Sequence, residues 1–398
     1  MIFKKHFRLL RKFLGNLARP RFGWRKKLTK LIKFCYLLVE WPFELLGDLL
    51  FFWKRLGKAG ISNPRRILII KIDQFGDVLF STFLLPIIKK KYPDVEIDYL
   101  INPKTKSLLE KNPYISNIYF WEDIFLLSLA GREKSRTGGL GEIRKKNRET
   151  MKILRSRHYD AVINTRANLP SSNIPWRRIG GALIAFDTSE QSFLADYWAE
   201  YDLDDEEWKD YLNLLRPLGI DVDSAVFHEE FYNFGNNPMV GKGKYVVLSP
   251  ISFDKERQWG SDNWRRLIEF IIKQGYLVAI TGMKDQETYI QDIMPKDREN
   301  VFVFTTLTLP YFGALMKGAK FFVGIESFPA HLALACGTKA FVFVFSSTYY
   351  IKGFSENRFM IEARNMLPVL EQMEFFNIRS ATSTVDIEKV IGKLVSQR

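Results

Sequence analysis

An aspartate directly after a predicted buried strand is the residue of this sequence best placed to do chemistry. Residues 67–70 are consecutively apolar, which predicts a short buried strand. A polar stretch, residues 71–77, separates this strand from apolar residues at helical spacing over residues 78–88. Gly76 is predicted at the turn from strand to helix, and Asp77 follows it. Because ligand sites in open α/β sheets form at the carboxyl ends of strands, Asp77 is a candidate catalytic group.

Other interpretations of the carboxylates in this turn stay open. Asp77 could instead cap the following helix, where the positive end of the helix stabilises a carboxylate. Asp73, four residues earlier, is the alternative general base. A further predicted strand within residues 158–166 ends in polar residues, the last of which is Arg166.

The elements that position these residues alternate between strands and helices. Such alternation is typical of a parallel sheet that helices cover on both faces. Residues 233–244 have the Gly, Asn and Pro content of a linker, and the alternation then restarts. We therefore predict an α/β protein with two Rossmann-like domains, residues 61–238 and 239–398. The last predicted helix, residues 385–395, could return to the first domain.

Composition limits the class of protein. The chain has 398 residues, of which 46% are hydrophobic and 26% charged, so it is neither disordered nor a protein with many membrane spans. Cys35 and Cys336 form no CxxC pair and suit a reducing cytoplasm. The four histidines show neither HxxxH nor HxH spacing. The sequence therefore predicts neither a disulfide framework nor a metal site.

The positive charge lies almost entirely in the first 60 residues. They contain 15 Lys and Arg against three acidic residues, so twelve of the fourteen net positive charges lie there. Basic residues alternate with Phe, Leu and Trp over residues 1–34, whereas residues 35–53 are more apolar but contain Glu40, Glu44 and Asp48. A membrane span needs about 20 residues with few charges, so these acids argue against one.

We therefore expect residues 1–60 to form amphipathic helices that lie in the membrane interface. Their aromatic face would enter the headgroup boundary, and their Lys and Arg side chains would meet anionic lipid. The alternative is that the apolar faces pack on the rest of the protein or on another subunit. We do not expect nucleic-acid binding, because no recognisable nucleic-acid fold accompanies the charge.

The motifs along the chain resemble those of the lipopolysaccharide heptosyltransferase family of glycosyltransferases. Gly76-Asp77-Val78 is similar to the family's Gly-Asp-Val, and the "YP" and "NP.I" elements follow within residues 92–115. Residues 248–270 look like the family's segment with Lys-x-Trp and an apolar helix, and residues 307–338 look like its donor-binding segment, Asp-Ser/Thr-Gly-x-x-His. The resemblance extends from about residue 65 to residue 345.

This resemblance implies a GT-B fold, in which two Rossmann-like domains face each other across a cleft. It implies an inverting, metal-independent transfer of a sugar, by default heptose from ADP-heptose, to a lipid-linked glycan such as the lipopolysaccharide core. The nucleotide sugar is then a co-substrate, and no cofactor is expected. Asp77 corresponds to the family's general base, which takes the proton of the acceptor hydroxyl. Asp73, Gly76 and Arg166 are expected on the acceptor side.

The donor site is expected in the second half of the chain. A leaving diphosphate without a metal needs backbone N–H groups at a helix N-terminus and cationic side chains. The residues that the resemblance places in the donor site are Ser249, Lys255, Arg257, Asp285, Leu307, Glu326, Ser327 and His331. Of these, Ser327, His331 and Arg257 or Lys255 would meet the diphosphate, Glu326 would lie near the ribose or the sugar, and Leu307 would border the base. Glu287 is the alternative to Asp285, His331 could be a buried structural histidine, and Lys255 and Arg257 could be surface charges.

The sequence also departs from the family pattern. Glu326 replaces the usual Asp, and Phe328 replaces the Gly that lets backbone approach the donor. These changes leave open a hexose or a deoxysugar on another nucleotide. They also support an alternative from another class, a catalytically inactive relative that serves as a membrane-bound assembly or regulatory subunit. A nucleotide-sugar epimerase is a third interpretation, which the membrane-seeking segment disfavours. We expect the protein at the cytoplasmic face of the bacterial inner membrane, as a peripheral protein.

Overall fold

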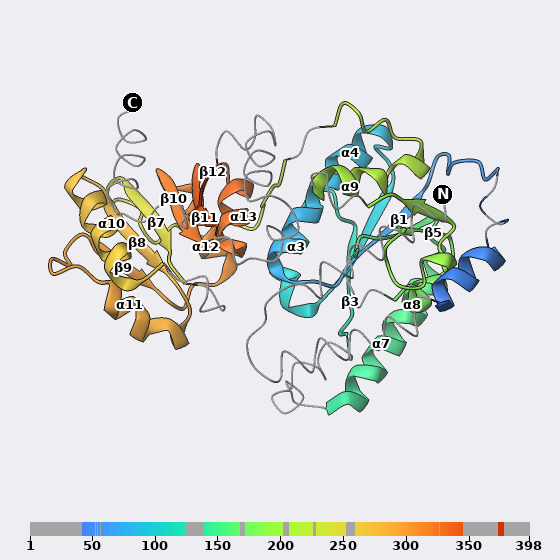
Figure 1. The fold of residues 1–398 in the computed structure, drawn as a ribbon, viewed down its shortest axis with the longest axis horizontal. Coiled ribbons are helices and arrows are strands. Elements are labelled where there is room, and N and C mark those ends of the chain that lie inside the picture. The colour runs from blue at the N-terminus through green and yellow to red at the C-terminus, as the bar shows by residue number, and fades with distance from the viewer. Residues whose placement is uncertain are drawn as a thin grey trace. The chain divides into compact units, whose positions relative to one another are not determined.

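A computed structural model describes the chain in two compact units, the first ending at Val226 and the second beginning at Phe227 (Figure 1). The described residues are 42–51, 53, 55, 57–123, 139–167, 172–201, 207–225, 228–251, 259–325, 327–344 and 373–377. The predictions for residues 1–41 and for the last helix, residues 385–395, lie outside them.

The first unit is built on a six-stranded sheet in the order β3-β2-β1-β4-β5-β6, with every neighbouring pair parallel. Its strands are β1 (Arg66–Lys71), β2 (Glu96–Ile101), β3 (Asn117–Phe120), β4 (Ala161–Asn164), β5 (Ala182–Phe186) and β6 (Tyr197–Ala199). Its labelled α-helices are α3 (Phe75–Phe80), α4 (Leu84–Lys91), α5 (Lys106–Leu109), α7 (Gly139–Ser156), α8 (Ile174–Arg177) and α9 (Glu207–Asn213). Short 3-10 turns are η2 (Ser81–Phe83), η3 (Pro103–Thr105), η5 (Ser192–Leu194) and η6 (Arg216–Leu218).

The second unit repeats this architecture, with the strand order β12-β11-β10-β7-β8-β9 and parallel pairing throughout. Its strands are β7 (Tyr245–Ser249), β8 (Leu277–Thr281), β9 (Val301–Phe304), β10 (Phe321–Ile325), β11 (Ala340–Val344) and β12 (Met373–Asn377). Its helices are α10 (Ser261–Lys273), η8 (Lys284–Gln286), α11 (Glu287–Ile293), α12 (Leu309–Lys317) and α13 (Phe328–Ala335).

Alternate residues of the second sheet bury opposite faces. Val246 and Leu248 of β7 join the core beneath α10 and α11. Tyr245 and Val247, their neighbours along the strand, join the core beneath α12 and α13. Since successive side chains of a strand point to opposite faces, the helices form layers on both sides of the sheet. The prediction of an α/β fold with parallel sheets is confirmed.

Two local predictions need correction. Helix α3 begins at Phe75, one residue before Gly76, so Gly76 lies inside the first turn of the helix and not between strand and helix. The predicted linker is also packed structure. The Phe231 N–H donates to the Ala335 carbonyl at 3.2 Å, and the Gly235 N–H donates to the Pro310 carbonyl at 2.9 Å. These bonds fix residues 231–235 against the ends of α13 and α12.

No helix within the described ranges has the length and apolar character needed to cross a membrane.

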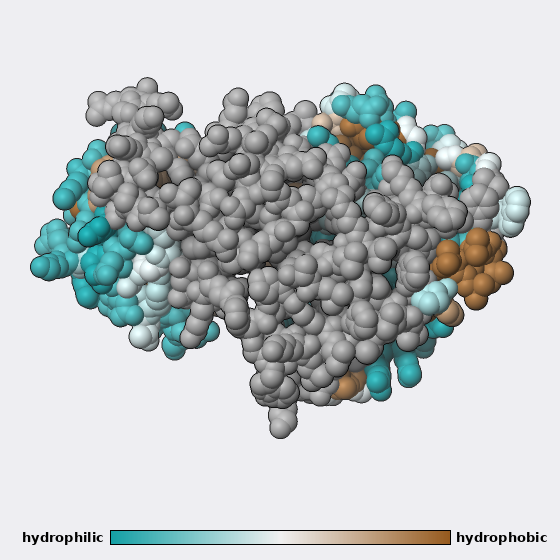
Figure 2. Space-filling model, in the orientation of Figure 1, coloured by the Kyte–Doolittle hydropathy of each residue, from teal (hydrophilic) through white to brown (hydrophobic). Residues whose placement is uncertain are grey.

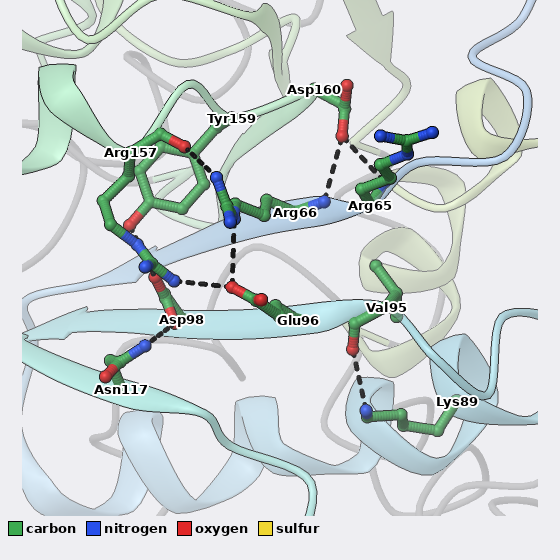
Figure 3. Close-up of polar contacts among 10 residues, drawn as sticks. All are labelled: Arg65, Arg66, Lys89, Val95, Glu96, Asp98, Asn117, Arg157, Tyr159 and Asp160. Atoms are coloured by element: carbon green, nitrogen blue, oxygen red, sulfur yellow. Dashed lines mark hydrogen bonds and ion pairs between the residues drawn. The ribbon is translucent and has the colours of Figure 1, made fainter.

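A buried carboxylate fastens the amino-terminal half of the first sheet (Figure 3). The side chain of Asp98, on β2, is fully buried. It accepts hydrogen bonds from Asn117 Nδ2 at 2.8 Å and Tyr159 Oη at 2.7 Å, and forms an ion pair with Arg157 Nε at 3.3 Å. Arg157 also contacts Glu96 at 2.6 Å, but Glu96 is 43% exposed. Asp98 therefore joins β2, β3 and the segment between α7 and β4.

We predict that Asp98→Ala destabilises the first unit by about 2–3 kcal/mol, because Arg157 and Tyr159 then lose their buried acceptor. Urea titration followed by tryptophan fluorescence measures this loss. Glu96→Ala is the matched control on the same strand, and its exposed ion pairs are worth less than about 1 kcal/mol. Equal destabilisation by the two variants would contradict the structural role of Asp98.

Candidate functional site

Charged side chains gather at the carboxyl end of the first sheet, where β1, β3 and β4 finish. Lys71 ends β1, Asp73 follows it, and Arg166 comes two residues after β4. Arg166 Nε lies 3.1 Å from Asp73 Oδ1, and Lys71 Nζ lies 3.2 Å from Asp73 Oδ2. Asp123, after β3, lies 3.4 Å from Arg166 Nη1. The prediction that strand ends bring polar groups together therefore applies to Asp73 and Arg166.

These contacts decide the state of Asp73. Burial by itself would raise the pKa of Asp73, but the hydrogen-bonded Lys71 ammonium and Arg166 guanidinium together lower the pKa below its usual value. The stability gained from this pairing is present above the ordinary carboxyl pKa and is lost only as the pH falls through the lowered one. Asp73 is thus held as a paired anion, which makes it a poor acceptor for a substrate proton.

Asp77 has the opposite environment. It is exposed on the third residue of α3, and no hydrogen bond or ion pair joins its carboxylate to another described residue. The helix N-cap is Gln74, in an extended conformation, so the alternative in which Asp77 is the cap is wrong. Its position in the first turn still places it near the positive helix end. An accessible carboxylate without a fixed partner is what a general base requires.

The strand ends hold Arg166 in place. The Arg166 backbone N–H donates to Asn164 Oδ1 at 3.2 Å, and Asn164 Nδ2 donates to Asn173 Oδ1 at 2.9 Å. The intervening residue, Thr165, donates from Oγ1 to the Ile70 carbonyl at 2.8 Å. Asn164 and Thr165 are fully buried, so the hydrogen bonds that join the loop after β4 to β1 are shielded from water.

The described candidates for donor binding share one edge of the second sheet. Each follows the carboxyl end of a parallel strand: Ser249 ends β7, Asp285 follows β8, Leu307 follows β9, and Ser327 and His331 follow β10. Strand ends of a parallel sheet face the same side, so these residues lie along a common edge. Lys255, Arg257 and Glu326 lie outside the described residues, and their predicted roles are untested.

The individual side chains differ in what they can offer. Ser327 is the N-cap of α13, but its Oγ donates to the Ile325 carbonyl at 3.0 Å and not to the helix. Leu307 packs against the core beneath α12. Asp285 is exposed, whereas Glu287, its alternative, accepts a bond from Thr305 Oγ1 at 2.9 Å. The amide groups at the start of α13 are therefore not used by the Ser327 side chain.

His331 is the best-defined functional candidate of the second unit. It lies in the first half of α13 with its side chain 37% exposed, and its Nδ1 is 3.1 Å from Glu229 Oε1. The Glu229 side chain is fully buried, and its Oε2 has no hydrogen-bond partner among the described residues. A buried carboxylate 3.1 Å from Nδ1 fixes the orientation of the ring. His331 is therefore not a fully buried structural histidine.

Sequence reasoning missed four participants in these clusters. They are Lys71, Asp123, Tyr211, whose hydroxyl accepts a bond from Lys71 Nζ at 2.5 Å, and Glu229. Lys71 and Asp123 could have been predicted from the sequence, because each is a charged residue at the end of a predicted strand. Glu229 could not, since it belongs to a segment without helical or strand periodicity.

Two further features lie apart from this site. Within the part of the chain that the structure describes, no group of three His, Cys, Asp or Glu side chains could hold a metal ion.

A hollow of about 820 Å³ lies at the amino-terminal edge of the first sheet, lined by residues that include Arg65, Glu96 and Asp160. The Asp160 carboxylate already accepts bonds from the Arg65 and Arg66 backbone, at 2.7 and 2.9 Å. The hollow is at the opposite edge from Asp77.

Comparisons with known proteins agree with the motifs. Residues 148–365 match the model of "Glycosyltransferase family 9 (heptosyltransferase)". Lipopolysaccharide heptosyltransferase 3 of Escherichia coli K12 is 24% identical over 344 residues, which are 80% of this chain and 93% of that protein.

Solved structures are similar in fold. The glycosyl transferase family 9 protein of Veillonella parvula superposes with a TM-score of 0.63 at 18% identity, over 83% of this chain and 89% of that chain. The E. coli heptosyltransferase WaaC with ADP superposes with a TM-score of 0.65 at 15% identity, over 82% and 99%. The resemblance to the heptosyltransferases is thereby confirmed, and since the family model covers more than half of its residues, the chain belongs to glycosyltransferase family 9, the heptosyltransferase family.

Proposed function

We propose that this protein is an inverting, metal-independent glycosyltransferase that moves a sugar from a nucleotide donor to a lipid-linked glycan of the cell envelope. The observation that carries the proposal is the contrast between Asp73 and Asp77 at the carboxyl end of β1. One carboxylate is neutralised by two cations, and the other is exposed and unpaired among the described residues. Membership of the heptosyltransferase family indicates that the reaction is sugar transfer. In that reaction the exposed carboxylate can serve as the general base.

Asp77 is the general base of the proposed reaction. An acceptor hydroxyl attacks the anomeric carbon of the donor, the bond from that carbon to the diphosphate oxygen breaks, and Asp77 takes the hydroxyl proton. Attack from the side opposite the leaving group inverts the anomeric configuration. Arg166 and Lys71 lie on the acceptor side, where their charges are balanced by Asp73 and Asp123.

The donor is bound by the second unit. Backbone N–H groups at the start of α13 and the His331 side chain meet the diphosphate. A diphosphate oxygen accepts hydrogen bonds, so His331 must present an N–H at Nε2. Because Nδ1 faces Glu229, Nε2 is the ring nitrogen that is left to meet the diphosphate. In a metal-independent reaction, His331 and these amides stabilise the charge of the leaving diphosphate. Lys255 and Arg257 are the further cations of the proposed site.

ADP-heptose is the default donor. A solved relative at 15% identity contains ADP, and the curated relatives are lipopolysaccharide heptosyltransferases. Lipopolysaccharide core is accordingly the default acceptor, and its lipid places the reaction at the cytoplasmic face of the inner membrane. The basic residues 1–41 would bind the anionic surface there. Similarity to a curated transferase over 80% of this chain does not favour the inactive-subunit alternative.

We predict that Asp77→Asn lowers the turnover number about 10²–10⁴-fold, because the amide cannot take the acceptor proton. Donor affinity should be unchanged. The measurement is the initial rate of product formation with a panel of ADP-, GDP-, UDP- and dTDP-linked sugars, together with calorimetric binding of the donor that reacts.

Two matched variants sharpen this test. Asp94→Asn changes an exposed carboxylate at the start of β2, far from the carboxyl edge of the same sheet, and should leave the rate unchanged. Asp73→Asn should lower the melting temperature, because Lys71 and Arg166 lose their counter-charge. A rate for Asp77→Asn near that of the unaltered protein would refute the role of Asp77 as general base. A larger rate loss in a folded Asp73→Asn protein would identify Asp73 as the general base.

We also predict that His331→Ala raises the dissociation constant for the nucleoside diphosphate about tenfold, because one charge-assisted hydrogen bond is lost. Glu229→Gln keeps an acceptor for Nδ1, so it should weaken ADP binding less than His331→Ala does. Calorimetry with ADP measures both. His228→Ala, at an exposed histidine beside Glu229, is the control. Unchanged ADP affinity in His331→Ala would contradict the diphosphate contact.

A further inference from the structure

The helix over residues 42–51 has its polar and apolar faces reversed relative to a helix packed on a protein. Its acidic residues are inside: Glu44 is 4% exposed, and Asp48 is 0% exposed. Large apolar side chains of the helix and of the turn after it are outside. They are Phe43, Leu46, Leu49, Leu50 and Trp53, which are 55–76% exposed and which we call the outward face. A surface helix of a globular protein normally buries its apolar stripe and exposes its charges.

The helix is fixed to the first unit by specific contacts. Glu44 accepts bonds from the backbone N–H and the hydroxyl of Ser192, at 3.1 and 3.3 Å. Phe51 stacks on Phe193 with ring centroids 5.8 Å apart. Gly47 allows this approach, because a Cβ there would lie 2.4–2.8 Å from the Phe193 ring. The outward face is therefore held in place by the protein beneath it.

Contacts after the helix extend this attachment to the edge strand of the sheet. Arg55 donates from Nε to the Ala195 carbonyl at 3.2 Å, and its guanidinium lies 3.9 Å from the centre of the Trp198 ring in β6. Lys58 pairs with Asp196 at 2.5 Å. The whole segment is thus part of the first unit.

The outward face forms a continuous apolar group on the surface. Positions 43, 46, 50 and 53 are spaced three or four apart, so they follow one side of the helix, and Leu49 lies beside them. Figure 2 shows strongly hydrophobic residues gathered at the right of the view, where Figure 1 places the blue helix. Contiguous apolar groups on a protein surface mark sites that interact with membranes or other proteins.

Charge identifies the partner. Residues 1–34, which precede this helix by only a few residues, contain twelve Lys and Arg and no acidic residue. The chain thus carries a dense positive charge shortly before the helix in the sequence. Pairing of this face with a second copy would bring two such segments together, and their repulsion opposes it. An anionic lipid bilayer offers an apolar interior for the five side chains and negative headgroups for the basic segment.

We infer that the outward face inserts into the headgroup boundary of an anionic membrane and that the first unit is carried on it as a rigid body. Phe43, Leu46, Leu49, Leu50 and Trp53 are the inserted side chains. Glu44 and Asp48, which would oppose insertion, are turned into the protein. The inference rests on the proposed function and deepens it. A lipid-linked acceptor lies in a membrane, so an enzyme that uses it must work at the membrane surface.

The experiment measures binding of the full chain to vesicles made of equal parts phosphatidylglycerol and phosphatidylcholine, by co-sedimentation at low and high salt. The test variant combines Leu46→Ser, Leu50→Ser and Trp53→Ser. The control combines Ile153→Ser, Val240→Ser and Val303→Ser, three apolar side chains that are exposed by 39–77% elsewhere.

We expect the test variant to bind at least about tenfold more weakly, with the deficit persisting at high salt, where attraction between the basic segment and lipid is screened. The control variant should bind like the unaltered protein, and both should keep its melting temperature. Binding of the test variant equal to that of the control would overturn the inference. So would a dimer in solution that the test variant turns into a monomer while vesicle binding is unchanged.

Transfer to an acceptor in detergent solution separates this inference from the proposed function. It should be equal in all three proteins, because none of the changed residues touches the reacting groups. Absence of transfer in the unaltered protein would count against the proposed function and leave the vesicle result standing.

Discussion

The pairing of Asp73 with Lys71 and Arg166 is the interaction on which the chemistry of the first unit depends. Lys71 is 4% exposed and Arg166 6% exposed, so both cations need a counter-charge within the protein. Asp73 supplies it, with one carboxylate oxygen for each cation. The next carboxylate along the chain, Asp77, is consequently not needed for neutralisation. The fold thus divides two acidic residues only four positions apart into one that holds the site together and one that is available to react.

In the second unit a buried acidic side chain, Glu229, contacts the partly exposed side chain of His331. A buried carboxylate with a single partner among the described residues depends on that partner, so the histidine ring cannot turn away without a cost in free energy. A buried carboxylate thus fixes the position of a group that faces solvent. Preorganisation of this kind lets a site work without reorganising during the reaction.

The sequence predicts the parts of this structure that depend on local pattern. An apolar run between polar residues marks a buried strand, and strand β1 extends one residue beyond each end of the strand predicted at residues 67–70. Strands β5 and β6 were missed: β6 has three residues, too few to show a period. Asp77 and His331 follow strands, so their place at a sheet edge could be predicted. Glu229 contacts His331 across 102 positions of sequence, and no local pattern carries such a pairing.

The acidic residues near the amino terminus show how tertiary structure changes the meaning of a local signal. In the sequence, Glu44 and Asp48 argue against a membrane span. In the structure they face the first unit, and the bonds from Ser192 to Glu44 help to dock the helix. The acidic residues therefore orient the outward face. Since this helix and Asp77 belong to one compact unit, a membrane bound at the outward face lies at a fixed distance from Asp77. A lipid-linked acceptor is confined to that same surface, and its concentration near Asp77 then depends on the surface and not on the bulk solution.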